Sequence, residues 1–295
     1  MSPATLAELV EQHAATLERA GVDSPRVDAE LLACHVTGLS RSALRTAGAP
    51  AAEQADRLAA LVRRRAAREP LQHLTGEAWF RELTLSVRPG VFVPRPETEV
   101  VAGLAIDAAR AAGDTPVVVD LCTGTGAIAL AVATEVPGAR VTAVDRSPDA
   151  AALARHNLAE LHAGHAGVRG PAAGATVEVL EGDLYDALPD GLRGHVDVLV
   201  SNPPYLPESD RGTLAPEVDA DPETALYAGP DGLEVVHRLL ADAHVWLRRG
   251  GTLVLELDPR SADRAVAAGV RYGLLEVSTV ADLTGTTRAL VARRP

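Results

Sequence analysis

The sequence predicts an α/β protein in which a mostly parallel sheet is covered by helices on both faces. From about residue 97 onward, short valine-rich runs alternate with alanine- and leucine-rich helical stretches, as is typical of parallel sheets. Residues 1–75 show helical periodicity instead, and between residues 83 and 93 the period changes to two. We therefore expect a small helical bundle over 1–75, a linking β-hairpin over 76–96 and an α/β domain over 97–295.

Three helices are expected in the N-terminal bundle. The stripe of an amphipathic helix runs through Leu6, Leu9, Val10, His13 and Leu17. Ser24-Pro25 places an N-cap residue and a proline at the start of a second helix. A third helix is expected from Asp56 to Arg68, ending before Pro70.

Four arginines gather on this third helix, and their spacing leaves two interpretations open. They are Arg63, Arg64, Arg65 and Arg68. One interpretation is a solvated helix face, and the other is a docking patch for an acidic or RNA-bound partner.

The elements of the remaining chain follow from alternation and turn residues. Leu83, Leu85 and Val87 alternate with polar residues, and Pro89-Gly90 is expected to turn the chain into a second hairpin strand at 91–93. Sheet strands are expected at 117–121, 140–145, 176–181, 196–201 and 251–257, with two more at 274–280 and 287–294 joined through Gly285. Residues 162–175 read as a loop insertion.

Composition excludes several classes of protein. With 295 residues, 47% of them apolar, the chain can bury a sizeable core, and no run of about twenty apolar residues or signal-peptide layout is present. We therefore expect a soluble cytoplasmic protein. The net charge of −12 counts against broad attraction to nucleic acid. The distant Cys34 and Cys122 indicate neither a disulfide framework nor a zinc site, and His162 with His165 is expected to be loop rather than metal site.

The first strand of the α/β domain leads into a glycine turn. Gly124 and Gly126 allow the backbone to turn tightly and to approach a ligand, before a helix that begins near Ala127. Asp145, nineteen residues after Gly126, ends the next strand, where a carboxylate can accept hydrogen bonds from a ribose. With Ala129, the two glycines also satisfy a dinucleotide fingerprint, and a purely structural turn is a further alternative.

Two acidic residues bear on the choice of cofactor. Asp120, just before the glycine turn, would repel a pyrophosphate but suits a cofactor with an ammonium group, such as S-adenosylmethionine. Asp183, after the third strand, would either accept from the adenine amino group or act as a helix N-cap.

The fourth strand ends at the corner Asn202-Pro203-Pro204-Tyr205. Because ligands bind beyond the carboxyl ends of parallel strands, this corner is expected to face the same crevice as the glycine turn. The prolines remove two N–H donors and leave carbonyl acceptors, Asn202 adds a side-chain acceptor, and Tyr205 adds a flat face. This array suits a planar –NH2 group, with one N–H directed to the Asn202 side chain and the other to the Pro203 carbonyl.

These residues resemble a known family. Asp120–Gly126 followed by Asn202–Tyr205 resembles the class I S-adenosylmethionine-dependent methyltransferases that act on planar nitrogen. A longer match, over Pro70–Gly76, Leu83–Val87 and Pro89–Glu99, is similar to the protein-(glutamine-N5) methyltransferases that modify peptide chain release factors. The resemblance covers nearly the whole chain.

The resemblance implies a fold, a reaction and a site. It implies a Rossmann-like seven-stranded sheet with an antiparallel C-terminal strand, and methylation of the glutamine in the Gly-Gly-Gln motif of bacterial class 1 release factors. The helical domain would help to bind the release factor, and no direct nucleic acid target, membrane or metal is implied; we expect a monomer. The implied catalytic and substrate-binding residues are Asn202, Pro203, Pro204 and Tyr205. The implied cofactor-binding residues are Asp120, Cys122, Thr123, Gly124, Thr125, Gly126, Asp145, Arg146, Asp183, Leu184 and Asn202.

The chain departs from the family pattern at three places. Cys122 replaces the usual glycine, so the first turn is expected to form without positive φ there. Leu184 replaces a residue that is often aromatic, which removes a stacking contact with adenine. Leu255-Glu256-Leu257-Asp258 lacks the usual Glu-x-Gly, which weakens a role for Glu256. Residues 94–97 would shape a lid over the cofactor, or Arg95 would form a structural salt bridge.

Three other functions fit the sequence less well. A DNA or RNA amino-methyltransferase would need a target-recognition region and a basic groove, and the chain has neither a spare domain nor the charge. A silent cofactor-binding scaffold would have no need of the acceptor corner. A nicotinamide dehydrogenase ranks last, because no acid/base constellation accompanies the glycine turn.

Overall fold

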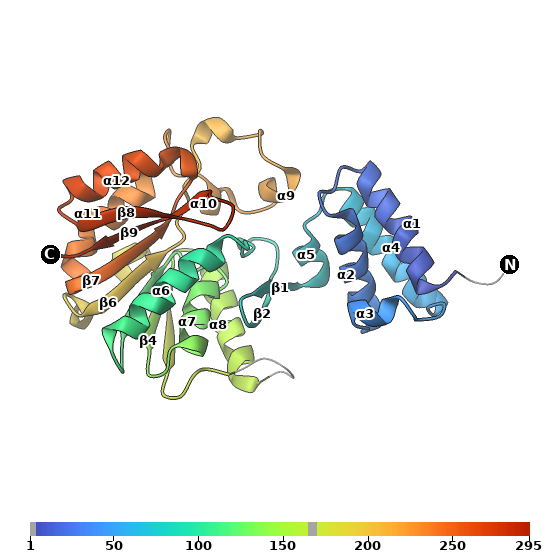
Figure 1. The fold of residues 1–295 in the computed structure, drawn as a ribbon, viewed down its shortest axis with the longest axis horizontal. Coiled ribbons are helices and arrows are strands. Elements are labelled where there is room, and N and C mark those ends of the chain that lie inside the picture. The colour runs from blue at the N-terminus through green and yellow to red at the C-terminus, as the bar shows by residue number, and fades with distance from the viewer. Residues whose placement is uncertain (1–3, 165–169) are drawn as a thin grey trace. The chain divides into compact units, whose positions relative to one another are not determined.

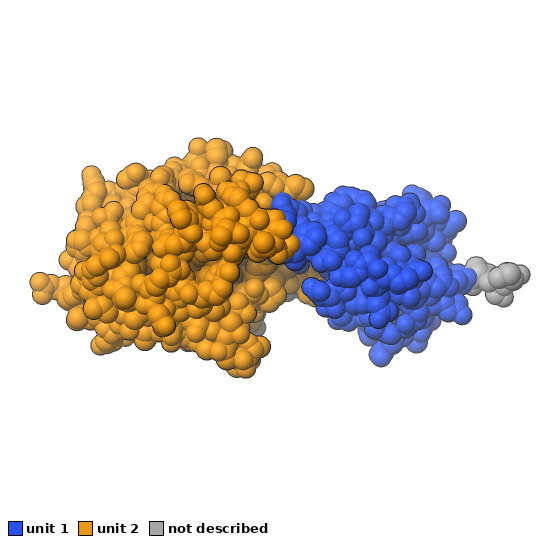
Figure 2. Space-filling view, turned by 90° about the horizontal axis from the view of Figure 1, so that it is seen from above, with its two compact units in different colours: residues 1–77, 215–220 blue, residues 78–214, 221–295 orange. Residues whose placement is uncertain are grey.

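The computed structural model describes residues 4–164 and 170–295, which form two compact units (Figure 2). The first unit, here called the helical unit, contains the chain up to Glu77 together with Ala215–Ala220. The second, the sheet unit, contains Ala78–Leu214 and Asp221–Pro295. Among the described residues, no helix is long and apolar enough to cross a membrane.

Five helices build the helical unit's N-terminal part: α1 Leu6–Arg19, α2 Pro25–Thr37, α3 Arg41–Leu44, α4 Ala52–Ala66 and α5 Leu71–Thr75. A capping box starts α1, because the Thr5 hydroxyl accepts from the Glu8 amide and the Glu8 carboxylate accepts from the Thr5 amide. Ser24 and Pro25 hold the N-cap and first helical positions of α2, as the sequence predicts. The third predicted helix is shifted: α4 begins four residues before Asp56 and ends at Ala66, because Arg68 adopts φ +68°.

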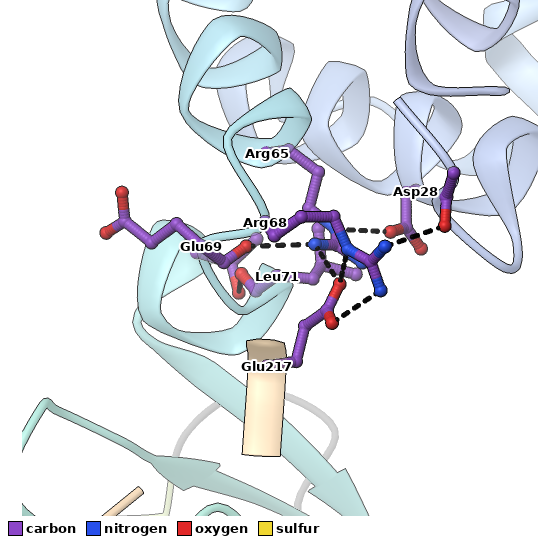
Figure 3. A network of polar contacts seen from close by, with 8 residues as sticks. Asp28, Arg65, Arg68, Glu69, Leu71 and Glu217 are labelled. Carbon is purple, nitrogen blue, oxygen red and sulfur yellow. Dashed lines mark hydrogen bonds and ion pairs between the residues drawn. The ribbon is translucent and has the colours of Figure 1, made fainter. Parts of the chain in front are cut away.

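The four arginines separate into two kinds, as Figure 3 shows for those that turn inward. Arg65 is buried and donates to Asp28 at 2.7 Å and to Glu217 at 2.7 Å. The Arg68 guanidinium donates to both carboxylate oxygens of Glu217, at 2.6 and 2.7 Å. Arg63 and Arg64 are exposed, and Arg64 pairs with Glu69. Neither a solvated face nor a docking patch therefore describes the whole cluster, since two of its members neutralise carboxylates inside the unit.

The hairpin forms earlier in the chain than its turn signal predicts. Its strands are β1 Glu77–Phe80 and β2 Leu83–Ser86, and Arg81 takes φ +53° in the turn between them. The predicted hairpin turn at Pro89-Gly90 is wrong, and residues 91–93 continue as irregular chain. Tertiary contacts explain the difference. The Arg81 amide donates to Glu99 at 2.9 Å, while the Val93 amide donates to the Asp221 carboxylate at 3.1 Å instead of pairing with a strand.

A seven-stranded sheet forms the centre of the sheet unit, in the order β5-β4-β3-β6-β7-β9-β8. The strands are β3 Val117–Leu121, β4 Arg140–Asp145, β5 Thr176–Glu181, β6 Val196–Ser201, β7 Leu247–Glu256, β8 Leu275–Ala281 and β9 Thr287–Arg293. All pairings are parallel except those of β9 with β7 and β8. The predicted fold class is confirmed, and the first four strands have the predicted bounds.

Helices cover both faces of this sheet (Figure 1). One apolar cluster packs α6 Thr98–Ala112, α7 Ala127–Glu135 and α8 Pro148–Ala163 against one face. The other packs α11 Glu234–Trp246 and α12 Ala262–Arg271 against the opposite face. Short helices connect these elements: η1 Leu184–Ala187, η2 Asp190–Leu192, η3 Glu208–Asp210, α9 Pro216–Asp219, α10 Glu223–Leu226 and η4 Pro259–Ser261. The buried strands read as continuous apolar runs because both faces are covered.

Candidate active site

Strand register brings the predicted site segments to one edge of the sheet. Leu121 at the end of β3 is level with Val144 of β4 and with Ser201 of β6. The residues that follow these strand ends are the glycine turn, Asp145 and the Asn202 corner. The Ser201 hydroxyl donates to the Leu121 carbonyl at 2.6 Å and ties two of the strand ends together. The expected common crevice is therefore present at the carboxyl ends of the parallel strands.

The glycine turn uses the left-handed backbone region three times. Cys122 has φ +60°, Gly124 +58° and Gly126 +85°. The expectation that position 122 would avoid positive φ is wrong: the path from β3 into α7 demands this conformation, and the cysteine adopts it at a cost of roughly 1–2 kcal/mol. A Cβ on Gly126 would lie 3.4 Å from the Ala154 side chain, whereas one on Gly124 would meet nothing within 4 Å, so the backbone at Gly124 is open to a ligand.

Asp120 lies beneath this turn and is completely buried. Its Oδ2 accepts from the Thr123 hydroxyl at 2.6 Å and from the Ala129 amide at 3.1 Å. Its Oδ1 has no hydrogen-bond partner anywhere in the described part of the chain. Burial raises the pKa of Asp120 to about 7, although the two hydrogen bonds lower it. An unsatisfied buried oxygen of this kind fits a cationic or N–H-bearing ligand group.

Asp145 and the turn hold each other in place. The Gly124 amide donates to Asp145 Oδ2 at 2.8 Å, and the Ser147 amide donates to Oδ1 at 2.9 Å. Burial raises the pKa of Asp145, against the effect of these hydrogen bonds. Thr123 and Thr125 are buried within the turn, and the Thr125 carbonyl accepts from Asn157 at 2.9 Å.

A pocket that is partly open to solvent lies at this edge. Six of the predicted site residues line it: Cys122, Asp145, Arg146, Asp183, Leu184 and Pro204. Its remaining lining was not anticipated and comprises Val144, Gly182, Thr224, Val235 and Arg238. Val144 and Gly182 are chain neighbours of the predicted Asp145 and Asp183, whereas Thr224, Val235 and Arg238 belong to α10 and α11, which come from distant sequence, so no local pattern indicates these three.

Asp183 and Leu184 form one wall of this pocket. Asp183 stands at the N-cap position of η1, but its carboxylate pairs with Arg238 at 2.8 Å and not with the helix backbone within the described residues. Asp183 therefore takes the predicted N-cap position without capping the helix through its side chain, and a contact with adenine stays a prediction. Leu184 takes φ +50° and is buried at the pocket wall, where it offers aliphatic surface.

The acceptor corner adjoins the pocket through Pro204. Pro203 and Pro204 are buried, and the Asn202 side-chain nitrogen donates to the Thr98 hydroxyl at 3.2 Å. The Tyr205 hydroxyl donates to Glu256 Oε1 at 3.2 Å. A Cβ on Gly232 would come within 2.2 Å of the Tyr205 carbonyl, so a glycine there is required for the corner to pack. The corner is rigid, and the Asn202 oxygen remains on its other side.

Thr98 and Glu256, which the sequence pattern does not single out as site residues, contact the acceptor corner. Glu256 is buried at the end of β7, and Thr98 is buried at the start of α6. Burial raises the pKa of Glu256 to about 7, although hydrogen bonding with Thr98 and Tyr205 lowers it. Its side chain thus contacts the corner although the Glu-x-Gly pattern is absent, and whether it has a functional role stays a prediction. The signal that could have found it is its place at the end of the strand next to β6.

Arg95 forms a structural salt bridge, which is one of the two alternatives expected for it. Its guanidinium pairs with the buried Asp221 carboxylate and lies 5.1 Å from the centre of the Phe92 ring. A lid formed by residues 94–97 stays a prediction. Within the described ranges, no group of three or more histidine, cysteine, aspartate or glutamate side chains is arranged to hold a metal ion. Of the two histidines expected to lie in a loop, His162 and His165, the second lies outside the described residues, as does part of the 162–175 loop.

Comparisons with known proteins bear directly on this site. Residues 8–76 match the family described as PrmC N-terminal domain, and residues 82–218 match the family described as Methyltransferase small domain. A release factor glutamine methyltransferase of Streptomyces coelicolor is 50% identical over 84% of this chain and 83% of its own length. Proteins with the same name from Deinococcus radiodurans and Mycolicibacterium smegmatis are 45% and 46% identical, and the matches cover 98% and 97% of this chain and 98% and 96% of theirs.

Solved structures with similar folds include two methyltransferases. The protein-(glutamine-N5) methyltransferase (release factor-specific) of Alicyclobacillus acidocaldarius is 27% identical, with a TM-score of 0.40 over 69% of this chain and 95% of that one. A methyltransferase from Pyrococcus furiosus is 18% identical, with a TM-score of 0.48 over 71% and 88%.

The parallel sheet with one antiparallel strand, the pocket at its edge and the matched catalytic domain together define the class: this protein is a methyltransferase. Identity of 45% to 50% over most of each chain narrows the class to one family. The chain belongs to the release factor glutamine methyltransferases.

Proposed function

We propose that this protein transfers a methyl group from S-adenosylmethionine to the side-chain amide nitrogen, N5, of the glutamine in the Gly-Gly-Gln motif of bacterial class 1 release factors, leaving S-adenosylhomocysteine. Membership of the family supports the reaction. The observation that carries the proposal is the corner itself, where Asn202 and the Pro203 carbonyl offer acceptors for an –NH2 group next to a pocket.

The pocket and the glycine turn are suited to S-adenosylmethionine, which supplies the methyl group when bound. The unpartnered Asp120 Oδ1, beneath the glycine turn, would accept from its ammonium group. Asp145, which lines the pocket, would accept from the ribose. Asp183 would accept from adenine, with Leu184 against the ring. The turn would complete the site through Cys122, Thr123, Gly124, Thr125 and Gly126, with the backbone open at Gly124, and Arg146 lines the pocket.

The acceptor corner would orient and activate the glutamine amide. An amide nitrogen is a poor nucleophile because its lone pair is delocalised. With one N–H donated to Asn202 Oδ1 and the other to the Pro203 carbonyl, electron density shifts toward nitrogen and the group is held in one orientation. Pro204 and the ring of Tyr205 would confine the side chain. No strong base is required, since the nitrogen becomes very acidic once methylated.

The remaining parts of the proposal concern partners and setting. The helical unit would help to bind the release factor, because the proposed catalytic and cofactor-binding residues all lie in the sheet unit. We propose that the enzyme acts as a monomer in the cytoplasm on a protein substrate, without a direct nucleic acid target. The acidic net charge of −12 supports a protein rather than a nucleic acid substrate.

A labelling experiment tests this function. Purified enzyme is incubated with S-adenosylmethionine labelled in the methyl group and with one of four acceptors: a release factor, the same factor with Gln→Ala in its Gly-Gly-Gln motif, bulk RNA or bulk DNA. We expect label only in the unaltered release factor. Label in nucleic acid, or in the Gln→Ala factor, would overturn the proposal.

A further inference from the structure

An ion pair joins two segments that line the pocket of the sheet unit. Arg238 Nη2 donates to Asp183 Oδ2 at 2.8 Å, and both residues belong to the pocket lining. Asp183 follows the carboxyl end of β5, whereas Arg238 lies on α11, more than fifty residues further along the chain. The sequence pattern singles out Asp183, but it gives no signal for Arg238.

The Asp183 carboxylate has one oxygen occupied and one available. Oδ2 accepts from Arg238, whereas Oδ1 accepts from no group in the part of the chain that the structure describes. The side chain makes no capping hydrogen bond with the described backbone of η1 either. Because an ionised carboxylate only accepts hydrogen bonds, Oδ1 is an acceptor that is available to a ligand with an N–H group.

Arg238 restricts the rotation of this carboxylate. The last torsion of an aspartate side chain is broad, so a carboxylate without a partner samples many orientations. A guanidinium bound to Oδ2 limits the carboxylate to the orientations that keep this charge-assisted hydrogen bond. Oδ1 is then held in one place, next to the aliphatic surface that the buried Leu184 contributes to the pocket.

We propose that Arg238 is a positioning residue that holds the Asp183 carboxylate so that Oδ1 accepts a hydrogen bond from the 6-amino group of adenine. This assignment rests on the proposed function, because the adenine is that of S-adenosylmethionine. It deepens that function by naming the residue that sets how well the pocket distinguishes adenine from a purine without the amino group.

Two other roles for Arg238 predict different results. The two side chains are 43% and 45% exposed, and such a pair contributes little to folding, so a purely structural role predicts no selective effect on ligand affinity. If Arg238 competed with adenine for Asp183, its removal would raise the affinity. Loss of Arg238 should not open the pocket, because Arg146 Nη2 donates to the Thr224 carbonyl at 3.1 Å and joins two other segments of the lining.

A thermodynamic cycle between protein and ligand measures the proposed contact. The protein is changed by Arg238→Met, which removes the guanidinium and keeps an unbranched apolar side chain at the pocket. The ligand is S-adenosylhomocysteine or its 6-deamino analogue, in which hydrogen replaces the amino group of adenine. Calorimetry gives the affinity of each protein for each ligand, and no release factor is required.

We expect Arg238→Met to lower the affinity for S-adenosylhomocysteine about fivefold, the upper end of what an exposed ion pair contributes. The affinity for the 6-deamino analogue should change less than about twofold, because that ligand has no amino group to donate to Asp183. Arg238→Lys keeps a cationic donor at this position, and its affinities should stay within about twofold of those of the unaltered protein.

Arg293→Met is the matched control. Arg293 pairs with Glu276 at 3.2 Å, its side chain is 52% exposed, and it is not one of the described residues that line the pocket. This variant should leave both affinities unchanged.

The results that would overturn the assignment differ from those that would refute the proposed function. In Arg238→Met, an equal change of affinity for both ligands, no change, or a gain for S-adenosylhomocysteine would remove Arg238 from the adenine site and leave the cofactor proposal standing. Failure of the unaltered protein to bind S-adenosylhomocysteine would refute the proposed cofactor, and with it this role of Arg238.

Discussion

Replacing Glu217 with glutamine should destabilise the helical unit, because this carboxylate is the shared partner of Arg65 and Arg68. Although partial burial raises its pKa, the hydrogen bonds from Arg68 and Arg65 outweigh that effect and hold the pKa at about 2, against an ordinary value of 4.5. At about 1.4 kcal/mol for each pKa unit, this difference corresponds to roughly 3 kcal/mol. The Glu217 side chain is 17% exposed, so solvent screening reduces the expected loss to about 2 kcal/mol.

The pH dependence of this loss has a definite sign. Because the pKa of Glu217 is depressed in the folded protein, its stabilising effect is fully present above pH 4.5 and fades as the pH falls toward 2. The difference in stability between Glu217→Gln and the unaltered protein should therefore be largest near neutral pH and shrink between about pH 5 and pH 2.

Tryptophan fluorescence would report only on the sheet unit, because both tryptophans, Trp79 and Trp246, lie there. Hydrogen exchange followed by mass spectrometry is therefore the suitable assay. Peptides from α2 and α4 should exchange roughly thirtyfold faster in Glu217→Gln, the equivalent of about 2 kcal/mol. Glu11→Gln is the matched control, since Glu11 pairs with Arg26 on the surface, where both side chains are 59% exposed. Equal exchange in the two variants would refute the reasoning.

Three further outcomes are expected in the sheet unit. Asn202→Ala should abolish methyl transfer to a release factor while calorimetry still detects S-adenosylhomocysteine binding, and retained turnover would remove Asn202 from the mechanism. Affinity for S-adenosylhomocysteine should rise with pH through about 7 and then level off, because burial raises the pKa of Asp120 to about 7 and a cationic ligand prefers the carboxylate. The variant Asp120→Asn should show a flat pH profile of affinity. A flat profile in the unaltered protein would contradict this prediction. Cys122→Gly should unfold in urea within about 1 kcal/mol of the unaltered protein, whereas Cys122→Val should lose roughly 2 kcal/mol more, because φ is +60° there. Equal stability of the glycine and valine variants would argue against strain at this position.

The regular part of the sheet unit could be predicted from sequence because its signals are local. The runs 117–121, 140–145, 176–181 and 196–201 are short, apolar and bounded by turn residues, and the structure reproduces their bounds. The corner and the glycine turn were placed at one edge by the general rule for parallel strands. What these predictions share is that residues close in sequence decide them.

The misplaced and missed features depend on contacts between distant residues. The hairpin turns at Arg81, a residue with no turn preference, because Glu99 and Glu135 hold its backbone and side chain. Thr98 and Glu256 meet at the corner only after α6 and β7 have packed beside β6. Positive φ at Cys122 follows from the path of the surrounding chain and not from the cysteine. Local sequence patterns do not predict such contacts between residues that are far apart in the chain.

Because the helical unit is built from two separate stretches of sequence, it cannot be completed when its N-terminal helices leave the ribosome. A ribosome delivers the N-terminal helices first, with Arg65 and Arg68 already in place, but Glu217 follows 152 and 149 residues later. N-terminal segments generally begin to fold while the rest of the chain is being made. Until residue 217 emerges, Arg65 can pair with Asp28, whereas Arg68 still lacks the carboxylate that it contacts in the folded unit. The bundle therefore reaches its full stability only after four of the seven strands of the central sheet, β3 to β6, have been translated.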